Sequence, residues 1–136
     1  MTTNVAIITR SLRLLGVLSE GETASADQGS ECLQHLNMML EQWTENDIEL
    51  GYFAQTSTAA DCPIPLWAES GVVSKLAQRL QAIYPAGTLA PWVMNDSENG
   101  YGTIARRCLL ALLQPSDMSH MPQGAGSFGR TEDITS

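Results

Sequence analysis

Apolar residues recur at helical spacing in the first half of the chain and predict two helices. Over residues 3–15 they lie three or four positions apart, on one face of a helix, at Val5, Ile8, Leu12 and Leu15. Thr3 or Asn4 can cap the start, and Gly16 suits the left-handed position that ends a helix. A second stripe predicts a helix from Ser25 or Asp27 to about Glu45. Its members are Cys32, Leu33, Leu36, Met39, Leu40 and Trp43.

The second half of the chain repeats this spacing over residues 66–84 and 91–113. The first of these stripes consists of Val72, Val73, Leu76, Ala77, Leu80 and Ile83. The second consists of Met94, Tyr101, Ile104, Cys108 and Leu112. Gly100 and Gly102 weaken the middle of the last helix and indicate either a kink or a close contact with another helix. Residues 108–113 are apolar on more than one face, so this run either occupies the centre of a bundle or meets a partner.

Two stretches lack helical spacing. Residues 48–58 read as an extended stretch or a weak hairpin arm, and Pro63 and Pro65 exclude a central strand after it. From residue 115 to 136 the chain is rich in Pro, Gly, Ser, Met and Gln and shows no period. We therefore expect an all-α fold: a small bundle of about four helices over residues 1–114, followed by a long extended C-terminal arm over residues 115–136.

Composition narrows the function classes. The 136 residues fit one domain, and only 16% are charged, against about 25% in an average soluble domain. A surface poor in charge is typical of a protein that packs against other proteins. Seven basic residues against fifteen acidic ones give a net charge of −8, which argues against an autonomous nucleic-acid-binding module. With no run of 18 apolar residues, we expect no membrane partner.

Residues that could carry chemistry do not form a recognisable site. Cys32, Cys62 and Cys108 show no metal-binding spacing and read as small core residues of a reducing compartment. Residues 124–129 match GxGxxG, but the required strand and helix are missing around them. His35 reads as a surface or interface residue, and no second histidine completes a metal pair. We expect no cofactor and no metal.

The acidic residues at the end of the second predicted helix leave one enzymatic alternative open. Paired carboxylates can act as acid and base in sugar cleavage, so a cell-wall (peptidoglycan) hydrolase is possible in principle. The more ordinary interpretation is a solvated acidic face, and we expect no enzyme activity. The residues concerned are Glu41, Glu45, Asp47 and Glu49.

Other residues indicate contacts between protein subunits. Arg106 and Arg107 form the only adjacent basic pair, which salt bridges between subunits explain better than nucleic acid does. Trp43 and Tyr52 are candidates for a subunit boundary because aromatic side chains often anchor interfaces. Most of the large aromatic residues, which also include Phe53, Trp67 and Trp92, should nevertheless lie in the core.

Three motifs, taken in order, resemble one protein family. Residues 12–17 read Leu-Arg-Leu-Leu-Gly-Val. Residues 36–39 read Leu-Asn-Met-Met and are followed by Trp43, Ile48 and Gly-Tyr at 51–52. Residues 121–127 read Met-Pro-Gln-Gly-Ala-Gly-Ser. A weaker match is Leu-Ala-Gln-Arg at residues 76–79. The set resembles the tail accessory factor, or packaged-DNA stabilisation protein, which is the head-to-tail adaptor of short-tailed phages.

The resemblance implies a mostly helical protomer that assembles as twelve copies below a dodecameric portal. It implies a lower surface that receives the next tail component (the tail hub or nozzle protein) and a channel that DNA passes through without specific binding. It also implies a virion location at the head–tail junction after assembly in the host bacterial cytoplasm. Candidate portal-docking residues in the arm are Met118, His120, Met121, Pro122, Gly124, Gly126 and Phe128. A connector of a long-tailed phage and a nucleic-acid-binding regulator remain alternatives.

Overall fold

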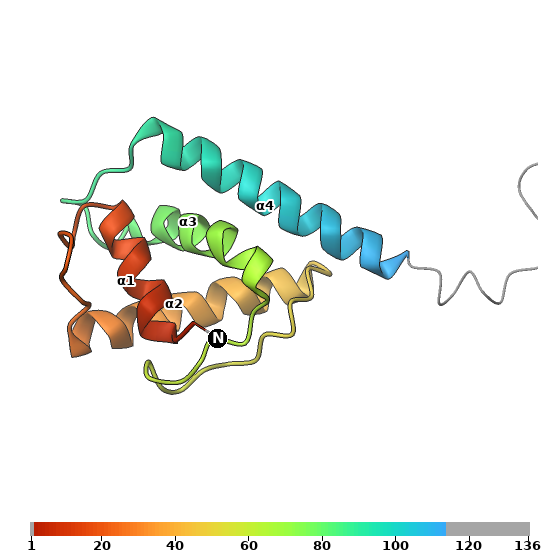
Figure 1. The fold of residues 1–136 in the computed structure, drawn as a ribbon, viewed down its shortest axis with the longest axis horizontal. Helices are drawn as coiled ribbons and strands as arrows, with labels where there is room; N and C mark the ends of the chain where they lie inside the picture. Colours follow the sequence, from red (N-terminus) through yellow and green to blue (C-terminus); the bar gives the residue numbers. More distant parts are fainter. Residues whose placement is uncertain (1, 114–136) are drawn as a thin grey trace, which may run out of the picture.

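The fold is a bundle of α-helices in which the third helix is central. The computed structural model describes residues 2–113 and gives α1 (Asn4–Leu14), α2 (Ala26–Glu45), the short 3₁₀ helix η1 (Leu66–Ala68), α3 (Glu69–Leu80) and α4 (Pro91–Leu112). Helix α3 packs against α1, α2 and α4 (Figure 1). The described residues contain four α-helices and no strand, which confirms the all-α prediction.

The helix boundaries follow from capping residues that the sequence already shows. The Thr3 hydroxyl accepts a hydrogen bond from the Ala6 amide, and Ser25 forms a reciprocal capping box with Gln28. Gly16, with φ +79°, lies just beyond α1, and Asp47, with φ 67°, lies just beyond α2. Pro91 occupies the first turn of α4, where its missing N–H costs no helical hydrogen bond.

Most residues of the predicted stripes lie in the core, and the exceptions are Val5 of the first stripe and positions in the last two stripes. The third stripe does not continue as one helix to residue 84, because α3 ends at Leu80 and a turn follows. In α4 the buried face begins at Val93 and Ser97 rather than at Met94, whose side chain is 45% exposed. Leu112 also lies outside the core at 55% exposed, because α4 runs past the helix on which it packs (Figure 1).

A long connection from α2 to η1 crosses the start of α1. The Asn4 and Val5 amides donate to the Ala60 and Thr58 carbonyls at 2.9 and 2.8 Å, and the Cys62 amide donates to the Thr2 carbonyl at 2.8 Å. The bonds from Asn4 and Val5 satisfy N–H groups that the first turn of any helix leaves without partners inside the helix. The hairpin alternative for residues 48–58 is wrong, because this stretch pairs with α1 and α2 rather than with itself. The described residues contain one isolated bridge, between Thr3 and Asp61.

Helices α3 and α4 approach closely where two glycines meet. A Cβ on Gly100 would lie 2.8 Å from the Cα of Gly71, and one on Gly71 would lie 3.1 Å from the Gly100 carbonyl. Around Gly102 a Cβ would meet no atom within 4 Å. The close-contact interpretation is therefore confirmed at Gly100, and Gly102 has no part in it.

Candidate functional site

The C-terminal end of α4 exposes a row of leucines, which we call the leucine tip: Leu109, Leu112 and Leu113. Their side chains are 56%, 55% and 65% exposed, whereas Cys108 beside them is buried. The alternative that residues 108–113 occupy the centre of a bundle is therefore wrong, since one face packs inward and another faces solvent, and the contact with a partner stays a prediction. Exposed apolar side chains gathered in one place are typical of a protein–protein contact.

An acidic edge borders the leucine tip. Leu109 and Leu112 line a shallow hollow of about 340 Å³ together with Tyr101 and the turn after α2, which contributes Asp47 and Ile48. Asp47 is exposed, as is Glu49 two residues further along the chain. The tip therefore combines an apolar centre with negative charge at one side.

A second apolar surface is concave, and we call it the α1–α4 groove. Its floor is formed by Val73 and Ser74 of α3, and its walls are Leu14 of α1 and Trp92 of α4, with Leu66 at one end. It encloses about 530 Å³. Leu66 is 81% exposed and Trp92 is 65% exposed.

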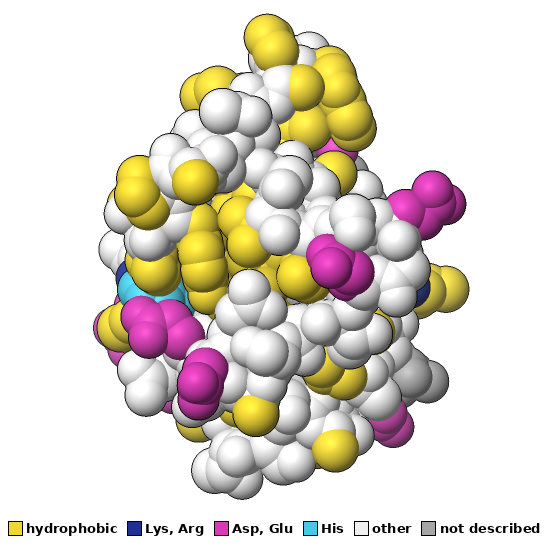
Figure 2. Space-filling view, turned by 90° about the vertical axis from the view of Figure 1, so that its left-hand side faces the viewer, with side chains coloured by type: hydrophobic (Ala, Val, Ile, Leu, Met, Phe, Trp, Pro, Cys, Tyr) yellow, Lys and Arg dark blue, Asp and Glu magenta, His cyan; other side chains and the backbone are white. Residues whose placement is uncertain are grey.

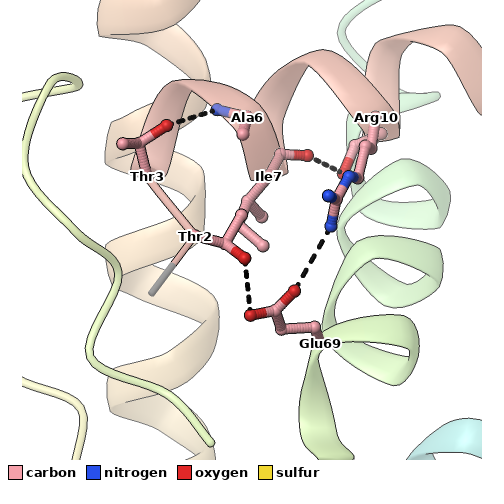
Figure 3. Close-up of polar contacts among 7 residues, drawn as sticks. Thr2, Thr3, Ala6, Ile7, Arg10 and Glu69 are labelled. Carbon is pink, nitrogen blue, oxygen red and sulfur yellow. Dashed lines mark hydrogen bonds and ion pairs between the residues drawn. The ribbon is translucent and has the colours of Figure 1, made fainter. Parts of the chain in front are cut away.

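Charged side chains surround the groove. Arg10 and Arg13 of α1 lie on one side, and Glu69 of α3 and Asp96 of α4 complete the lining. Glu69 is nearly buried: it accepts a 2.7 Å hydrogen bond from the Thr2 hydroxyl and lies 3.3 Å from the Arg10 guanidinium (Figure 3). Asp96 accepts a hydrogen bond from the Ser74 hydroxyl. Both carboxylates therefore have partners within the chain, and half of the Arg10 side chain stays exposed.

The end of the molecule where α4 begins is apolar as well. Figure 2 views this end, and hydrophobic side chains gather at its top, over the start of α4, where Trp92 and Met94 are exposed. Acidic side chains are scattered over the same face, and little Lys or Arg is visible there. The distribution agrees with the net charge of −8.

The four candidate subunit-interface residues separate into two groups. Arg106 and Arg107 are exposed on α4, and the Arg107 guanidinium stacks 4.3 Å from the centre of the Trp67 ring. Trp43 and Tyr52 are buried at 6% and 9% exposure, so they offer a neighbouring subunit little surface.

Each of the two buried aromatic residues has a structural partner. The Trp43 ring packs edge-to-face against the Tyr101 ring, with 5.0 Å between the ring centroids, and this contact joins α2 to α4. The Tyr52 hydroxyl donates a hydrogen bond to the Asn37 side chain, and burial raises the pKa of Tyr52. Both therefore act as core residues of the protomer.

Several other candidate residues are placed without forming a site. Glu41, Glu45, Asp47 and Glu49 are exposed at the end of α2 and in the connection that follows, which is the arrangement of a solvated acidic face. Within residues 2–113, no group of three or more His, Cys, Asp or Glu residues could hold a metal ion. No helix in that range is long and apolar enough to cross a membrane. The arm residues lie outside the described part of the chain: Met118, His120, Met121, Pro122, Gly124, Gly126 and Phe128.

His35 and the cysteines have shifted acidities for physical reasons that do not require catalysis. Burial, and then the Arg79 guanidinium, lower the pKa of His35, whose Nδ1 accepts a hydrogen bond from Arg79 Nε at 3.4 Å. Burial raises the pKa of Cys62 to about 12 and also raises the pKa values of Cys32 and Cys108. All three thiols are free and buried, as predicted for small core residues.

Sequence reasoning missed the α1–α4 groove. It counted Trp67 and Trp92 among aromatic residues that should mostly be core, yet they are 38% and 65% exposed. The sequence did indicate that Trp92 is exposed. Trp92 follows Pro91, which begins the helix, and precedes Val93, the first residue of the buried stripe, so it lies beside that stripe and not in it. Leu66 gave no comparable signal.

Comparisons with known proteins give no assignment. A scan against models of protein families found no match, and a search of curated protein sequences found none either.

Proposed function

We propose that this chain is a structural virion protein, a head-to-tail adaptor that forms a ring below the portal of a short-tailed phage. In this role it extends the DNA channel, receives the next tail component and performs no catalysis. The observation that carries the proposal is the leucine tip, which exposes Leu109, Leu112 and Leu113 directly before the segment with the arm motif. An apolar helix end followed by a Pro- and Gly-rich segment suits docking onto a larger assembly.

Charge supports the same role. A ring through which DNA moves must not hold the phosphates, and a protomer with a net charge of −8 repels them. Few basic residues are available for a nucleic-acid contact. Lys75 pairs with Glu98 at 2.8 Å, Arg10 pairs with Glu69, and Arg107 stacks on Trp67.

In the proposed assembly, the arm attaches each adaptor subunit to the portal. Once one protomer has docked, tethering makes the next contacts effectively intramolecular, and several copies around a ring add avidity. Ordering an extended arm costs about 1–2 kcal/mol of backbone entropy per residue, so each arm must gain that energy from its contact with the portal.

The test is a mass measurement on the protein mixed with the portal ring of its virion. The full chain is compared with a version that ends at Gln114, which retains the whole core described above. We expect the full chain to saturate at one copy per portal subunit and the shortened chain to fail to bind. If neither version binds the portal, the adaptor proposal is wrong.

A further inference from the structure

Two apolar surfaces on this chain differ in form. The leucine tip is the exposed end of a helix beside a hollow of about 340 Å³. The α1–α4 groove is a larger concave site of about 530 Å³, which lies within the range of roughly 300–1,000 Å³ typical of binding pockets. Leu66 and Trp92 in the groove are as exposed as the leucines of the tip. The protomer thus presents a helix end that can insert into a groove and a groove that can receive a helix end.

The leucine tip has the pattern by which a helix enters a groove. Leu109, Leu112 and Leu113 are spaced i, i+3 and i+4, so they form one stripe along the last turn of α4 and its C-cap. The groove runs over α3 between α1 and α4, which is the arrangement that accepts one more helix beside those already packed.

The charges on the α1 side of the groove complement those beside the leucine tip. Asp47 lines the hollow at the leucine tip, and Glu49 is exposed nearby. Arg10 and Arg13 of α1 line one side of the groove, and Arg10 is half exposed beyond its contact with Glu69. Glu69 and Asp96, which complete the lining, accept hydrogen bonds from Thr2 and Ser74 within the chain. A leucine tip that enters with its acidic edge toward α1 would therefore bring carboxylates toward guanidinium groups.

The tip cannot enter the groove of its own chain. Trp92, a groove wall, and Leu112, a tip residue, belong to the same 22-residue helix. At about 1.5 Å per residue they are held roughly 30 Å apart. Any contact between tip and groove must therefore join two molecules.

We infer that the leucine tip of one copy packs into the α1–α4 groove of the next copy, in a head-to-tail contact. Because the two surfaces differ, the contact is heterologous and repeats from copy to copy, which is the kind of contact that closes a ring when the rotation fits. The inference deepens the proposed function by naming the faces through which neighbouring adaptors meet.

The experiment uses full-length chains that each lack one of the two surfaces. The tip variant carries Leu109→Glu and Leu112→Glu, and the groove variant carries Leu66→Glu and Trp92→Glu. All four side chains are more than half exposed, so the core is untouched, and circular dichroism checks the fold. Phe53→Glu is the matched control, because Phe53 is 66% exposed and lines neither surface.

Sedimentation velocity in about 0.15 M salt, which screens the repulsion between acidic copies, measures the association. We expect the wild type and Phe53→Glu to self-associate as concentration rises, and each surface variant alone to stay monomeric. An equimolar mixture of the two variants retains one intact tip and one intact groove. It should give a dimer of two 14.7 kDa chains and nothing larger.

Three results would overturn the inference. The first is a wild type that stays monomeric up to about 1 mM, and the second is a mixture of the two variants that forms no dimer. The third is self-association that disappears when residues 115–136 are removed, because the arm would then be the occupant of the groove. Portal binding is measured in parallel on the same chains. A monomeric wild type that still binds the portal overturns only this contact, whereas self-association without portal binding overturns only the adaptor proposal.

Discussion

Gly71 and Gly100 touch at the crossing of α3 and α4, where a Cβ on Gly100 would lie 2.8 Å from the Gly71 Cα. The atoms in the way belong to the backbone, so rotation of a side chain cannot relieve the overlap. Because neither glycine has a side chain at the crossing, the two helices can approach closely. This approach packs Ile104 of α4 against Gly71 of α3. This crossing fixes where α4 lies, and α4 carries the leucine tip and one wall of the groove.

Gly100→Ala should lower the free energy of unfolding by about 1–3 kcal/mol, because the added methyl group separates α3 from α4. Gly102→Ala is the matched control two positions away. Its methyl group meets nothing within 4 Å, so the better helix propensity of alanine should raise stability by about 0.5–1 kcal/mol. Urea unfolding followed by circular dichroism measures both. Equal effects of the two substitutions would contradict the close crossing.

Asn37 should anchor the connection between α2 and η1. Its Nδ2 donates to the Gln55 carbonyl at 2.9 Å, and its Oδ1 accepts from the Gln55 amide at 2.8 Å. Asn37→Ala leaves the amide and carbonyl of the buried Gln55 unpaired and should cost about 2–3 kcal/mol. Gln34→Ala, on the exposed side of α2, should change stability by less than about 0.5 kcal/mol. Hydrogen exchange at the Gln55 amide should accelerate only in the Asn37 variant.

His35 should make stability depend on pH. Its folded pKa is lowered from 6.5, so the unfolded chain takes up a proton at a higher pH than the folded chain does. The stabilisation is complete above about pH 6.5 and is lost as the pH falls below that value toward the folded pKa. Unfolding measured from pH 8 to pH 5 should therefore show a decline for the wild type that is weaker for His35→Gln.

A matched variant isolates the His35 effect. His120→Gln changes the other histidine of the chain, which lies in the predicted arm, and it should keep the decline of the wild type. If His35→Gln and the wild type lose stability in parallel, the lowered pKa of His35 does not govern this dependence.

The cysteines should resist alkylation while the protein is folded. All three thiols are buried, and the raised pKa of Cys62, about 12, leaves little thiolate at pH 8. We expect iodoacetamide to modify Cys32, Cys62 and Cys108 slowly in buffer and all three rapidly in denaturant, with Cys62 the slowest in buffer. Intact-mass spectra over time give the count. Rapid modification of a native thiol would show that the segment around it opens readily.

The sequence was sufficient to predict the helices because their causes are local. The stripe that ends with Trp43, the Ser25 cap and the Pro91 start each depend on residues within a few positions of one another. The course of the connection between α2 and η1 could not be predicted, because the hydrogen bonds that hold it, such as those between Asn37 and Gln55, join residues far apart in the chain. Extended residues without a hydrophobic period also give no indication of what they will contact.

The candidate site was predictable only in part. The apolar run 108–113 indicated either the centre of a bundle or a contact with a partner, and one of its faces proved exposed. The α1–α4 groove was not predictable, because it depends on how three helices are placed and not on the pattern of any one of them. Trp92 and Leu66 read as ordinary apolar residues until α1 and α4 are placed on either side of α3.

The contact between α1 and the connection after α2 also has a consequence during synthesis on the ribosome. Asn4 Nδ2 donates to the Ser57 carbonyl, 53 residues later in the chain. At roughly 5–20 residues per second, the partner of Asn4 is made about 3–11 s after Asn4 itself. Helix α1 therefore leaves the ribosome before the segment that contacts its first turn exists. The contact can form only after α2 and most of the connection have been made.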